Sequence, residues 1–592
     1  MGSSGSERRF WSLVVFVLAV MAAVQFTAAL RESQTWDEAV HLSAGYSYLK
    51  TADFSLNAEH PPLGKFLAAL PLLFLRPDIG VDRPGWQHRD KWEFGREFLY
   101  HNRVPAGLLL MLGRSPTIVV SILLGLAVAL WTATHFGRPA ALLAVLLLAF
   151  DPTVLAHGRY VTNDLLVTLL MFLACVTWGR FLREPARRRL LLAGLALGLA
   201  LLSKFSAVLL APIFVALYVV RWRQQRAPAA PGDRPLNRLS MKHLISSVSL
   251  AGAIAFLTLY AGYAFETRTF LSQPQLADKY GGSLEMLKGR AGVGQLADAS
   301  TARGRLAFWV AMNVPVPIRS YFTGLYWVTR ESTIGRPTFL LGQYYPSGVW
   351  YYFPTVFLLK TPLATLAFLL LAGIFAVRRL SAHRFSALGS WLRGLDFNWF
   401  VLAVPPAIFV AAALRSRLNL GLRHLLPAYP FLFIFAAAIL AGPGGARSKA
   451  WLRALCVALS AVLLVESVSI YPHHLAFVNA AAGGPGAGAR YLSLVDLDWG
   501  QDLKRLKSFV DSRKDSPLCL AYAGTADPDY YAIPHQYLPL TGEDDKIRQL
   551  DCLAAISVSN LNARGRRYLW LVGRQPVARV GYSIYIYDLR KR

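Results

Sequence analysis

Thr35-Trp-Asp-Glu-Ala-Val-His41 directly follows the first long apolar run of the chain, residues 10–30, and decides how the rest is interpreted. Two adjacent carboxylates, Asp37 and Glu38, stand at the end of a run long enough to cross a bilayer. One interpretation is structural, because carboxylates solvate the end of a helix. In a chain dominated by membrane spans, however, acidic residues beside a span are a functional hypothesis by default.

The rest of the chain repeats this apolar pattern. Hydrophobic residues make up 55% and charged residues 16% of the sequence, so charge lies well below the quarter that is usual in soluble domains. Hydropathy predicts about eleven spans, near residues 10–30, 106–134, 138–156, 161–182, 188–203, 204–222, 243–264, 350–377, 397–414, 424–441 and 450–471. The sequence therefore predicts a polytopic α-helical membrane protein.

The formal net charge of +28 is concentrated in short loops between the apolar runs. Arginines cluster in residues 180–189, 221–242, 378–393 and 447–453. The positive-inside rule places these loops and the N-terminus in the cytoplasm, and an odd number of spans then places the C-terminus outside. No basic stripe with interleaved aromatics indicates nucleic acid, so the excess charge is assigned to orientation and to anionic membrane lipids.

Two domains are predicted. Residues 7–471 form the membrane domain, whose long outer loops are 31–105 and 265–349, and residues 472–592 form a small α/β domain on the outer face. Within the first loop, residues 37–49 and 91–102 are expected to be interfacial helices. In the C-terminal domain we expect a helix over 502–510 and strands over 518–522 and 583–589.

Three motifs occur in order within the first two hundred residues: Asp37-Glu38, His60-Pro-Pro-Leu-Gly-Lys65 and Arg159-Tyr-Val-Thr-Asn-Asp164. Together they resemble the protein O-mannosyltransferase family. The resemblance implies a GT-C membrane glycosyltransferase that uses a polyprenyl-phosphate sugar as donor. Residues 419–429 and 498–503 resemble bacterial members of the wider family, which are described as phospholipid-carrier-dependent glycosyltransferases. The C-terminal domain does not resemble the β-trefoil insert of the eukaryotic members. This departure argues against a protein Ser/Thr acceptor.

The acidic pair has a chemical role in such a reaction. Glycosyl transfer needs a base that takes the proton of the acceptor hydroxyl. Asp37 is the candidate base, by analogy with the first acidic residue of the family's Asp-Glu pair. Glu38 either orients the acceptor or restrains an arginine.

The leaving phosphate needs cations or hydrogen-bond donors, because negative charge builds on it in the transition state. His60 either faces the active cavity or caps a turn, and Lys65 either reaches the lipid phosphate or snorkels to the membrane surface. Arg159 and Asp164 are about one helical turn apart, so they are expected to pair, with Arg159 on the donor phosphate or in a purely structural ion pair. The remaining candidates for contact with donor phosphate are Lys360, Arg423 and His424.

Metal and cysteine patterns complete the expectations. No His, Cys or Asp spacing matches a standard metal motif, so neither a metal nor another cofactor is expected, a divalent ion remaining the alternative. Asp498 is expected to cap a helix. Cys519 and Cys552 lie 33 positions apart in the domain predicted to be extracytoplasmic, where disulfides form, and are expected to be bridged.

The leading hypothesis is an inverting glycosyltransferase of the bacterial inner membrane. It moves a sugar from a polyprenyl phosphate to an acceptor hydroxyl on the periplasmic side. The acceptor is a protein, a lipid or a glycan. A lipid-linked sugar flippase or transporter is the alternative from another class, and it would favour charges at the bilayer midplane and paired halves.

Overall fold

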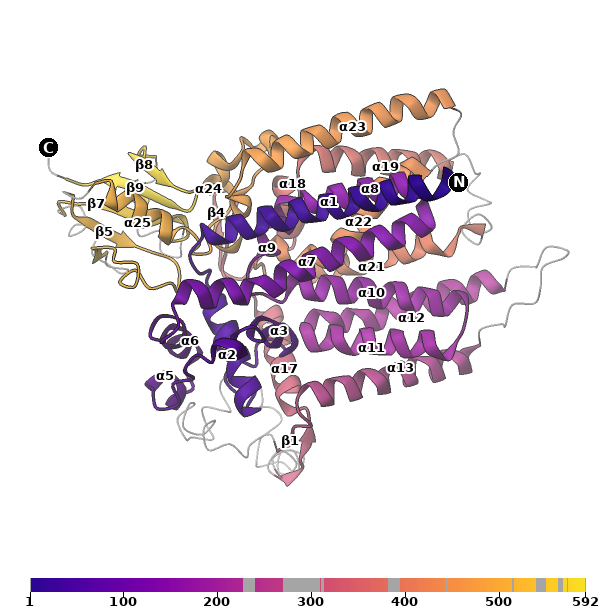
Figure 1. Cartoon of the computed structure of the whole chain (residues 1–592), viewed down its shortest axis with the longest axis horizontal. Helices are drawn as coiled ribbons and strands as arrows, with labels where there is room; N and C mark the ends of the chain where they lie inside the picture. The colour runs from indigo at the N-terminus through magenta and orange to yellow at the C-terminus, as the bar shows by residue number, and fades with distance from the viewer. Residues whose placement is uncertain are drawn as a thin grey trace.

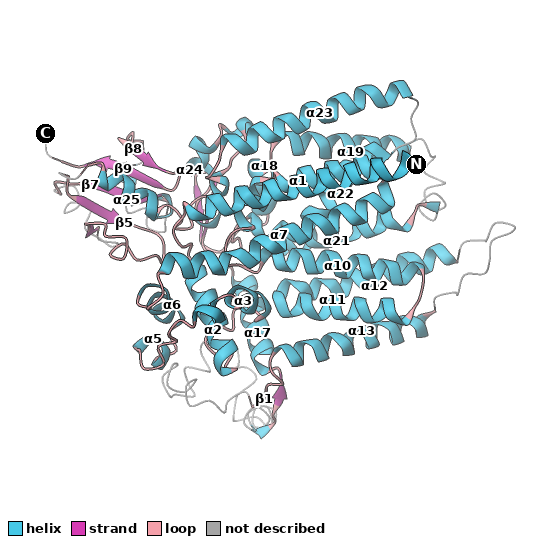
Figure 2. Ribbon diagram, in the orientation of Figure 1, coloured by secondary structure: helices cyan, strands magenta, loops and turns pink. Residues whose placement is uncertain are grey.

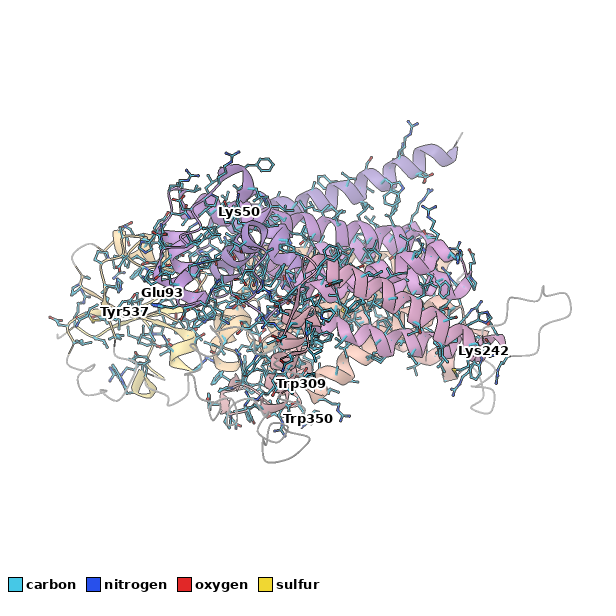
Figure 3. All side chains as sticks on the ribbon, turned by 90° about the horizontal axis from the view of Figure 1, so that it is seen from below. Lys50, Glu93, Lys242, Trp309, Trp350 and Tyr537 are labelled. Atoms are coloured by element: carbon cyan, nitrogen blue, oxygen red, sulfur yellow. A yellow bond between two sulfur atoms is a disulfide. The ribbon has the colours of Figure 1, made fainter. Side chains whose placement is uncertain are left out.

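The computed structural model describes residues 2–226, 240–269, 309, 313–381, 394–441, 446–513, 516–538, 550–562, 568–571 and 573–590. Long helices lie side by side in a bundle, and a small sheet domain sits at one end of it (Figure 1). The N-terminus lies at the opposite end of the bundle, and the C-terminus lies in the sheet domain. Lys242, from one of the basic loops, is likewise at the end opposite Lys50, Glu93 and Tyr537 (Figure 3).

Within the described residues, eight helical segments are long and apolar enough to cross a membrane. They are α1 (Gly2–Leu30), α7 (Ala106–Phe136), α10 (Asp164–Arg183), η1 with α12 (Phe205–Gln225), α13 (Met241–Gly262), α21 (Phe397–Arg415), η3 to η4 (Leu422–Ala441) and α23 (Ala446–Ser469). α18 (Tyr352–Lys360) and α19 (Leu363–Ser381) pass the same test together but are bent by 114°. The chain is thus a polytopic α-helical membrane protein.

Two of the predicted spans are short helices: the span predicted at 138–156 ends early, whereas the one predicted at 188–203 has the expected length. α8 (Arg138–Ala149) has 12 residues and α11 (Arg187–Ser203) has 17, although both run alongside the longer helices. α11 packs closely on α13 because Gly194 and Gly198 let the backbones meet: a Cβ at Gly198 would lie 2.9 Å from the Ala255 Cα. Small residues four apart are a common way for membrane helices to pack.

Polar side chains from much later in the chain form hydrogen bonds with the backbone at the bend between α18 and α19. The Asn479 side chain donates hydrogen bonds to the carbonyls of Leu358, at 2.6 Å, and Thr361, at 3.1 Å. The carboxylate of Glu466 accepts from the Leu363 amide at 3.0 Å, at the start of α19. Backbone groups freed by a break in an apolar helix need such partners.

The first long loop folds over the end of the bundle that bears the sheet domain. α2 (Glu38–Thr51) and α6 (Lys91–Tyr100) confirm the two expected helices. Between them lie α3 (Leu63–Ala69), α4 (Leu72–Leu75) and α5 (Pro84–Gln87). Most of α2 is buried, so it is part of the core rather than an interfacial helix. Residues 270–308 and 310–312 of the second predicted loop lie outside the described residues, as do 227–239 and 382–393 of the basic loops.

The described part of the second loop contains two short hairpins and one helix. β1 (Thr267–Arg268) pairs with β2 (Val316–Pro317), and β3 (Thr338–Leu340) pairs with β4 (Gln343–Tyr345). Between the hairpins lies the helix α17 (Arg319–Ile334).

The C-terminal domain contains a five-stranded sheet in the order β6-β5-β7-β9-β8 (Figure 2). β5 (Leu518–Ala521) runs parallel to β6 (Gln536–Tyr537) and β7 (Leu553–Ser557), whereas β9 (Ile584–Asp588) runs antiparallel to β7 and to β8 (Ala578–Val580). The amphipathic helix α25 spans Leu503–Asp511, close to the expected range. The disulfide expected between Cys519 and Cys552 is present.

Candidate functional site

A cavity of about 2030 Å³ opens where the helical bundle meets the first loop and the C-terminal domain. Ordinary small-molecule sites measure roughly 300–1,000 Å³, so this cavity has room for more than one substrate. Its lining combines residues that are far apart in the sequence: Asp37, His41, His60, Asp164, Lys204, Arg423, His424, Asp498 and Trp499.

Four charged side chains with alternating sign line one part of the cavity. The Arg423 Nη1 atom lies 3.3 Å from Asp37 Oδ2 and 3.8 Å from Asp164 Oδ2. The ammonium of Lys204 lies 2.5 Å from Asp164 Oδ1. The side chain of Asp37 is 23% exposed and that of Arg423 11% exposed, so this ion pair is open to the cavity.

The ends of several elements bring these charges together. Asp37 directly precedes α2, and Asp164 stands in the first turn of α10, where the helix dipole favours an acidic residue. Lys204 occupies the reversal between α11 and η1, and Arg423 belongs to the short helix η3 that precedes α22 (Tyr429–Ala437). Each charge is therefore held by a helix end rather than by a loose loop.

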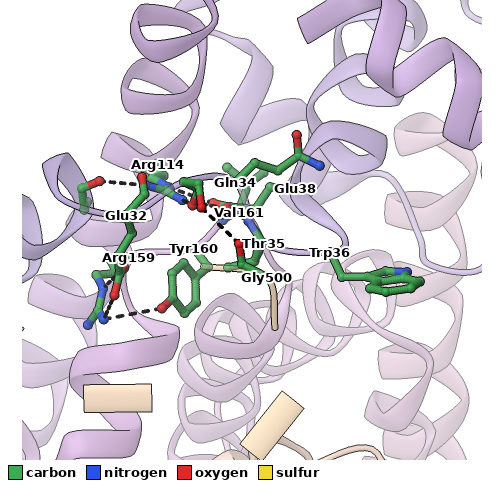
Figure 4. A network of polar contacts seen from close by, with 12 residues as sticks. Glu32, Gln34, Thr35, Trp36, Glu38, Arg114, Arg159, Tyr160, Val161 and Gly500 are labelled. Carbon is green, nitrogen blue, oxygen red and sulfur yellow. Dashed lines mark hydrogen bonds and ion pairs between the residues drawn. The ribbon is translucent and has the colours of Figure 1, made fainter. Parts of the chain in front are cut away.

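Glu38, the second acidic residue of the motif, faces the protein interior. Its carboxylate accepts two hydrogen bonds from Arg114 of α7, at 2.8 and 2.7 Å, and further bonds from the amides of Thr35 and Val161 (Figure 4). Both partners of this ion pair are fully buried. Of the two roles considered for Glu38, the structure places it on an arginine.

Arg159 forms a second buried ion pair. Its guanidinium donates two hydrogen bonds to the carboxylate of Glu32, at 2.8 and 2.6 Å (Figure 4). Neither side chain of this pair is more than 1% exposed. The expected pair between Arg159 and Asp164 is therefore wrong: Arg159 binds Glu32, and Asp164 binds Lys204 instead.

Two histidines also line the cavity. The rings of His41 and His60 pack edge to face with centroids 5.5 Å apart, and both side chains line the cavity. His41 Nδ1 lies 3.0 Å from the Val161 carbonyl, so it carries the proton and donates it there. Burial lowers the pKa of His41 to about 4 and lowers that of His60 as well, so both rings are neutral at pH 7.

The two lysines predicted as phosphate ligands are not among the cavity-lining side chains. Lys65 donates to the carbonyls of Asn57, at 2.6 Å, and His60, at 2.8 Å, and its burial lowers its pKa to about 7. Lys360 donates to the carbonyls of Leu475, at 2.7 Å, and Asp496. Both ammonium groups stabilise buried turns in this arrangement.

Asp498 does not cap a helix. α25 begins at Leu503 with Asp502 in the capping position, and Asp498 instead accepts a hydrogen bond from the Ser559 amide at 3.0 Å. Burial raises the pKa of Asp498 to about 7. Within the described ranges, no three His, Cys, Asp or Glu side chains are grouped to hold a metal ion, and the expectation of a metal-free protein stays a prediction.

Comparison with known proteins finds a family model that is similar to one segment of the chain. Residues 110–232 match the family described as dolichyl-phosphate-mannose-protein mannosyltransferase. The match covers 123 of the 592 residues and is a likeness of this segment to the family. No curated protein sequence matches the chain.

Several solved structures are similar at low sequence identity. ArnT from Cupriavidus metallidurans bound to undecaprenyl phosphate is 14% identical with a TM-score of 0.42, covering 98% of this chain and 99% of that one. The same protein in the apo state is 15% identical over the same shares, with a TM-score of 0.32. The oligosaccharyltransferase of Archaeoglobus fulgidus, in complex with zinc and sulfate, is 14% identical with a TM-score of 0.39, covering 88% of this chain and 57% of that chain.

The mannosyltransferase-family segment supplies Asp164 and Lys204, whereas Asp37, Arg423 and Trp499 come from outside it. Sequence analysis missed Lys204 and Trp499. For Lys204 a signal existed, because it is a lone cation in a reversal that the positive-inside rule assigns to the outer side. Trp499 lies in the stretch 498–503 that the sequence analysis singled out, but its contact with Arg423 joins positions far apart in the sequence and could not be predicted.

Proposed function

We propose that the chain is an inverting glycosyltransferase that moves a sugar from a polyprenyl-phosphate donor to an acceptor hydroxyl. One observation carries the proposal: a carboxylate and a guanidinium, Asp37 and Arg423, face the same large cavity at one end of a membrane bundle. A base and a phosphate ligand are the two groups that this chemistry requires. The likeness of residues 110–232 to the mannosyltransferase family supports the choice of reaction.

In this mechanism Asp37 accepts the proton of the acceptor hydroxyl. The hydroxyl oxygen attacks the anomeric carbon from the face opposite the phosphate, forming the new glycosidic bond. The bond between the anomeric carbon and the phosphate oxygen breaks, and its electron pair stays on that oxygen. Arg423 and Lys204 stabilise the resulting negative charge, and one displacement inverts the anomeric configuration.

The contact between Arg423 and Asp37 links donor binding to the base. In the structure the Arg423 guanidinium forms an ion pair with the Asp37 carboxylate at 3.3 Å. A donor phosphate competes for the same guanidinium, because arginine forms strong bidentate bonds to phosphate oxygens. Donor binding thus leaves Asp37 free to take a proton.

The acceptor is a protein, a lipid or a glycan, and the cavity of about 2030 Å³ accommodates a bulky group of any of these kinds. We place the cavity on the periplasmic face of a bacterial inner membrane, because Lys242, beside one of the basic segments, lies at the other end of the bundle. A lipid-linked sugar transporter is the second candidate. It is favoured less, because the charges gather at helix ends rather than at the middle of the bundle.

The test is a transfer assay with the purified, full-length protein. Synthetic polyprenyl-phosphate sugars with different sugar headgroups are incubated with candidate protein, lipid and glycan acceptors, and released polyprenyl phosphate and glycosylated product are quantified together. Stoichiometric product and lipid phosphate support the proposal. Movement of the intact donor across vesicle membranes without product would favour the transporter instead.

A further inference from the structure

The segment Asp498-Trp-Gly-Gln-Asp502 of the C-terminal domain pairs with the strand-like stretch that leads to Asp37. The Trp36 amide donates to the Trp499 carbonyl at 2.9 Å, and the Ser33 amide donates to the Gln501 carbonyl at 3.0 Å. The hydroxyl of Ser33 also donates to the Gly500 carbonyl at 3.0 Å. The backbone immediately before the proposed base is therefore held by the C-terminal domain.

The side chain of Trp499 reaches the other half of the proposed site. The Arg423 Cζ atom lies 4.5 Å from the centre of the Trp499 ring, well within the range of a cation–π contact. Trp499 is only 3% exposed, and its ring also meets the rings of Tyr160, at 5.7 Å, and His157, at 5.8 Å. A ring clamped in this way offers a fixed face to the guanidinium.

The segment is itself anchored inside the C-terminal domain. The Asp498 carboxylate accepts from the Ser559 amide at 3.0 Å, and Asp502 accepts from the hydroxyl of Ser583 at 2.7 Å. These bonds join both ends of the segment to residues that border β7 and β9. The position of Trp499 is thus set by the sheet.

We propose that Trp499 is a positioning residue for the transfer reaction: its carbonyl fixes the backbone before Asp37, and its ring fixes the guanidinium of Arg423. The C-terminal domain thereby completes the site of the membrane domain. The catalytic role of Trp499 rests on the proposed function, whereas its contacts are observed independently of that function.

The experiment compares three variants of the full-length protein. Trp499→Ala removes the ring, and loss of a desolvated cation–π contact should raise the KM for the donor roughly 10- to 30-fold. Trp499→Phe keeps an aromatic face and should restore the KM to within about threefold of wild type. Trp570→Ala is the matched control, because Trp570 belongs to the same domain, has Arg574 5.4 Å from its ring centre and does not line the cavity. The control should keep the wild-type KM.

A double-mutant cycle separates positioning from general stability. If Trp499 acts through Arg423, Trp499→Ala should add nothing in an Arg423→Ala background, whereas a purely structural loss would add in full. Equal KM values for Trp499→Ala and Trp570→Ala, or full additivity with Arg423→Ala, would overturn the inference.

Binding of undecaprenyl phosphate without acceptor is measured in the same variants, so the contact is tested even if no transfer occurs. If the wild type binds this lipid without transferring sugar, the proposed function fails. Weaker binding by Trp499→Ala alone would in that case still support the positioning role, and equal binding by all variants would refute it.

Discussion

The stretch from Glu32 to Glu38 contains two kinds of acid–arginine pair. Glu32 and Glu38 bind Arg159 and Arg114 in pairs without solvent exposure, whereas Asp37, next to Glu38, binds Arg423 at the cavity surface. The chemistry of the pairs is the same, and only their burial differs. In a fully buried pair each charge is compensated only by its partner. In the partly exposed pair both groups can also contact a ligand. Burial, more than residue type, separates a structural charge from a functional one here.

Asp37→Asn tests the partly exposed pair and should have the largest effect. The amide keeps the shape but cannot accept a proton, so kcat should fall by about 10²- to 10⁴-fold, the usual contribution of a general base. Donor binding and thermal unfolding should stay near wild type. Asp511→Asn, at an exposed position on α25, is the control. Near-normal turnover by Asp37→Asn would remove Asp37 from the mechanism.

Glu38→Ala tests a fully buried pair and should act on stability. It leaves the fully buried Arg114 without its carboxylate, which should lower the free energy of unfolding by about 3–5 kcal/mol. Glu184→Ala breaks an exposed pair with Arg189 and should cost about 1 kcal/mol or less. Denaturant titrations in detergent measure both. A similar cost for the two variants would contradict the distinction drawn from burial.

Arg423→Ala removes the cation of the partly exposed pair. Loss of one charge-stabilising donor should lower kcat/KM by about 10²- to 10³-fold, with weaker binding of the lipid donor. Arg187→Ala, at an exposed position at the start of α11, should have no such effect. If the two variants behaved alike in the transfer assay, Arg423 would be a structural residue only.

Asp498 should give the smallest effect, a change in the pH dependence of stability. Its folded pKa of about 7 lies above the ordinary value because the carboxylate is buried, so the folded state binds an extra proton between about pH 4 and pH 7. Stability from this group is complete below that window and is lost as pH rises through it. Asp498→Asn should therefore lose less thermal stability than wild type between pH 5 and pH 8, whereas Asp511→Asn should follow wild type. An unchanged slope in Asp498→Asn would contradict the shift.

Local pattern was enough to predict much of the architecture. Apolar runs predicted the helices, and amphipathic and alternating stretches predicted α25, β5 and β9, because burial imposes those periods on a sequence. Length was the weak point for α8, which was expected to run to residue 156 but ends at Ala149. Asp151 instead caps a separate short helix that begins at Pro152, and the hydropathy window averaged over this break.

The candidate site was predictable only in part. Asp37 and Arg423 follow from charges placed at membrane helix ends, and the structure brings both into the cavity. Pairing partners were not predictable, because they come from tertiary structure: Arg159 binds Glu32, 127 positions away, rather than Asp164 on its own turn. Lys360 shows the same limit, since its buried position beside distant carbonyls has no local signature.

The bend between α18 and α19 has a consequence for biosynthesis. The polar groups that bind its backbone, on Glu466 and Asn479, are translated about a hundred residues after the bend itself. Until they arrive, exposed backbone groups at Thr361 and Leu363 would be costly in lipid. We therefore expect the nascent segment to enter the membrane first as a straighter helix and to bend only after α23 has inserted. Glu466 of α23, and Asn479 after it, thus complete the hydrogen bonds of the earlier bend between α18 and α19.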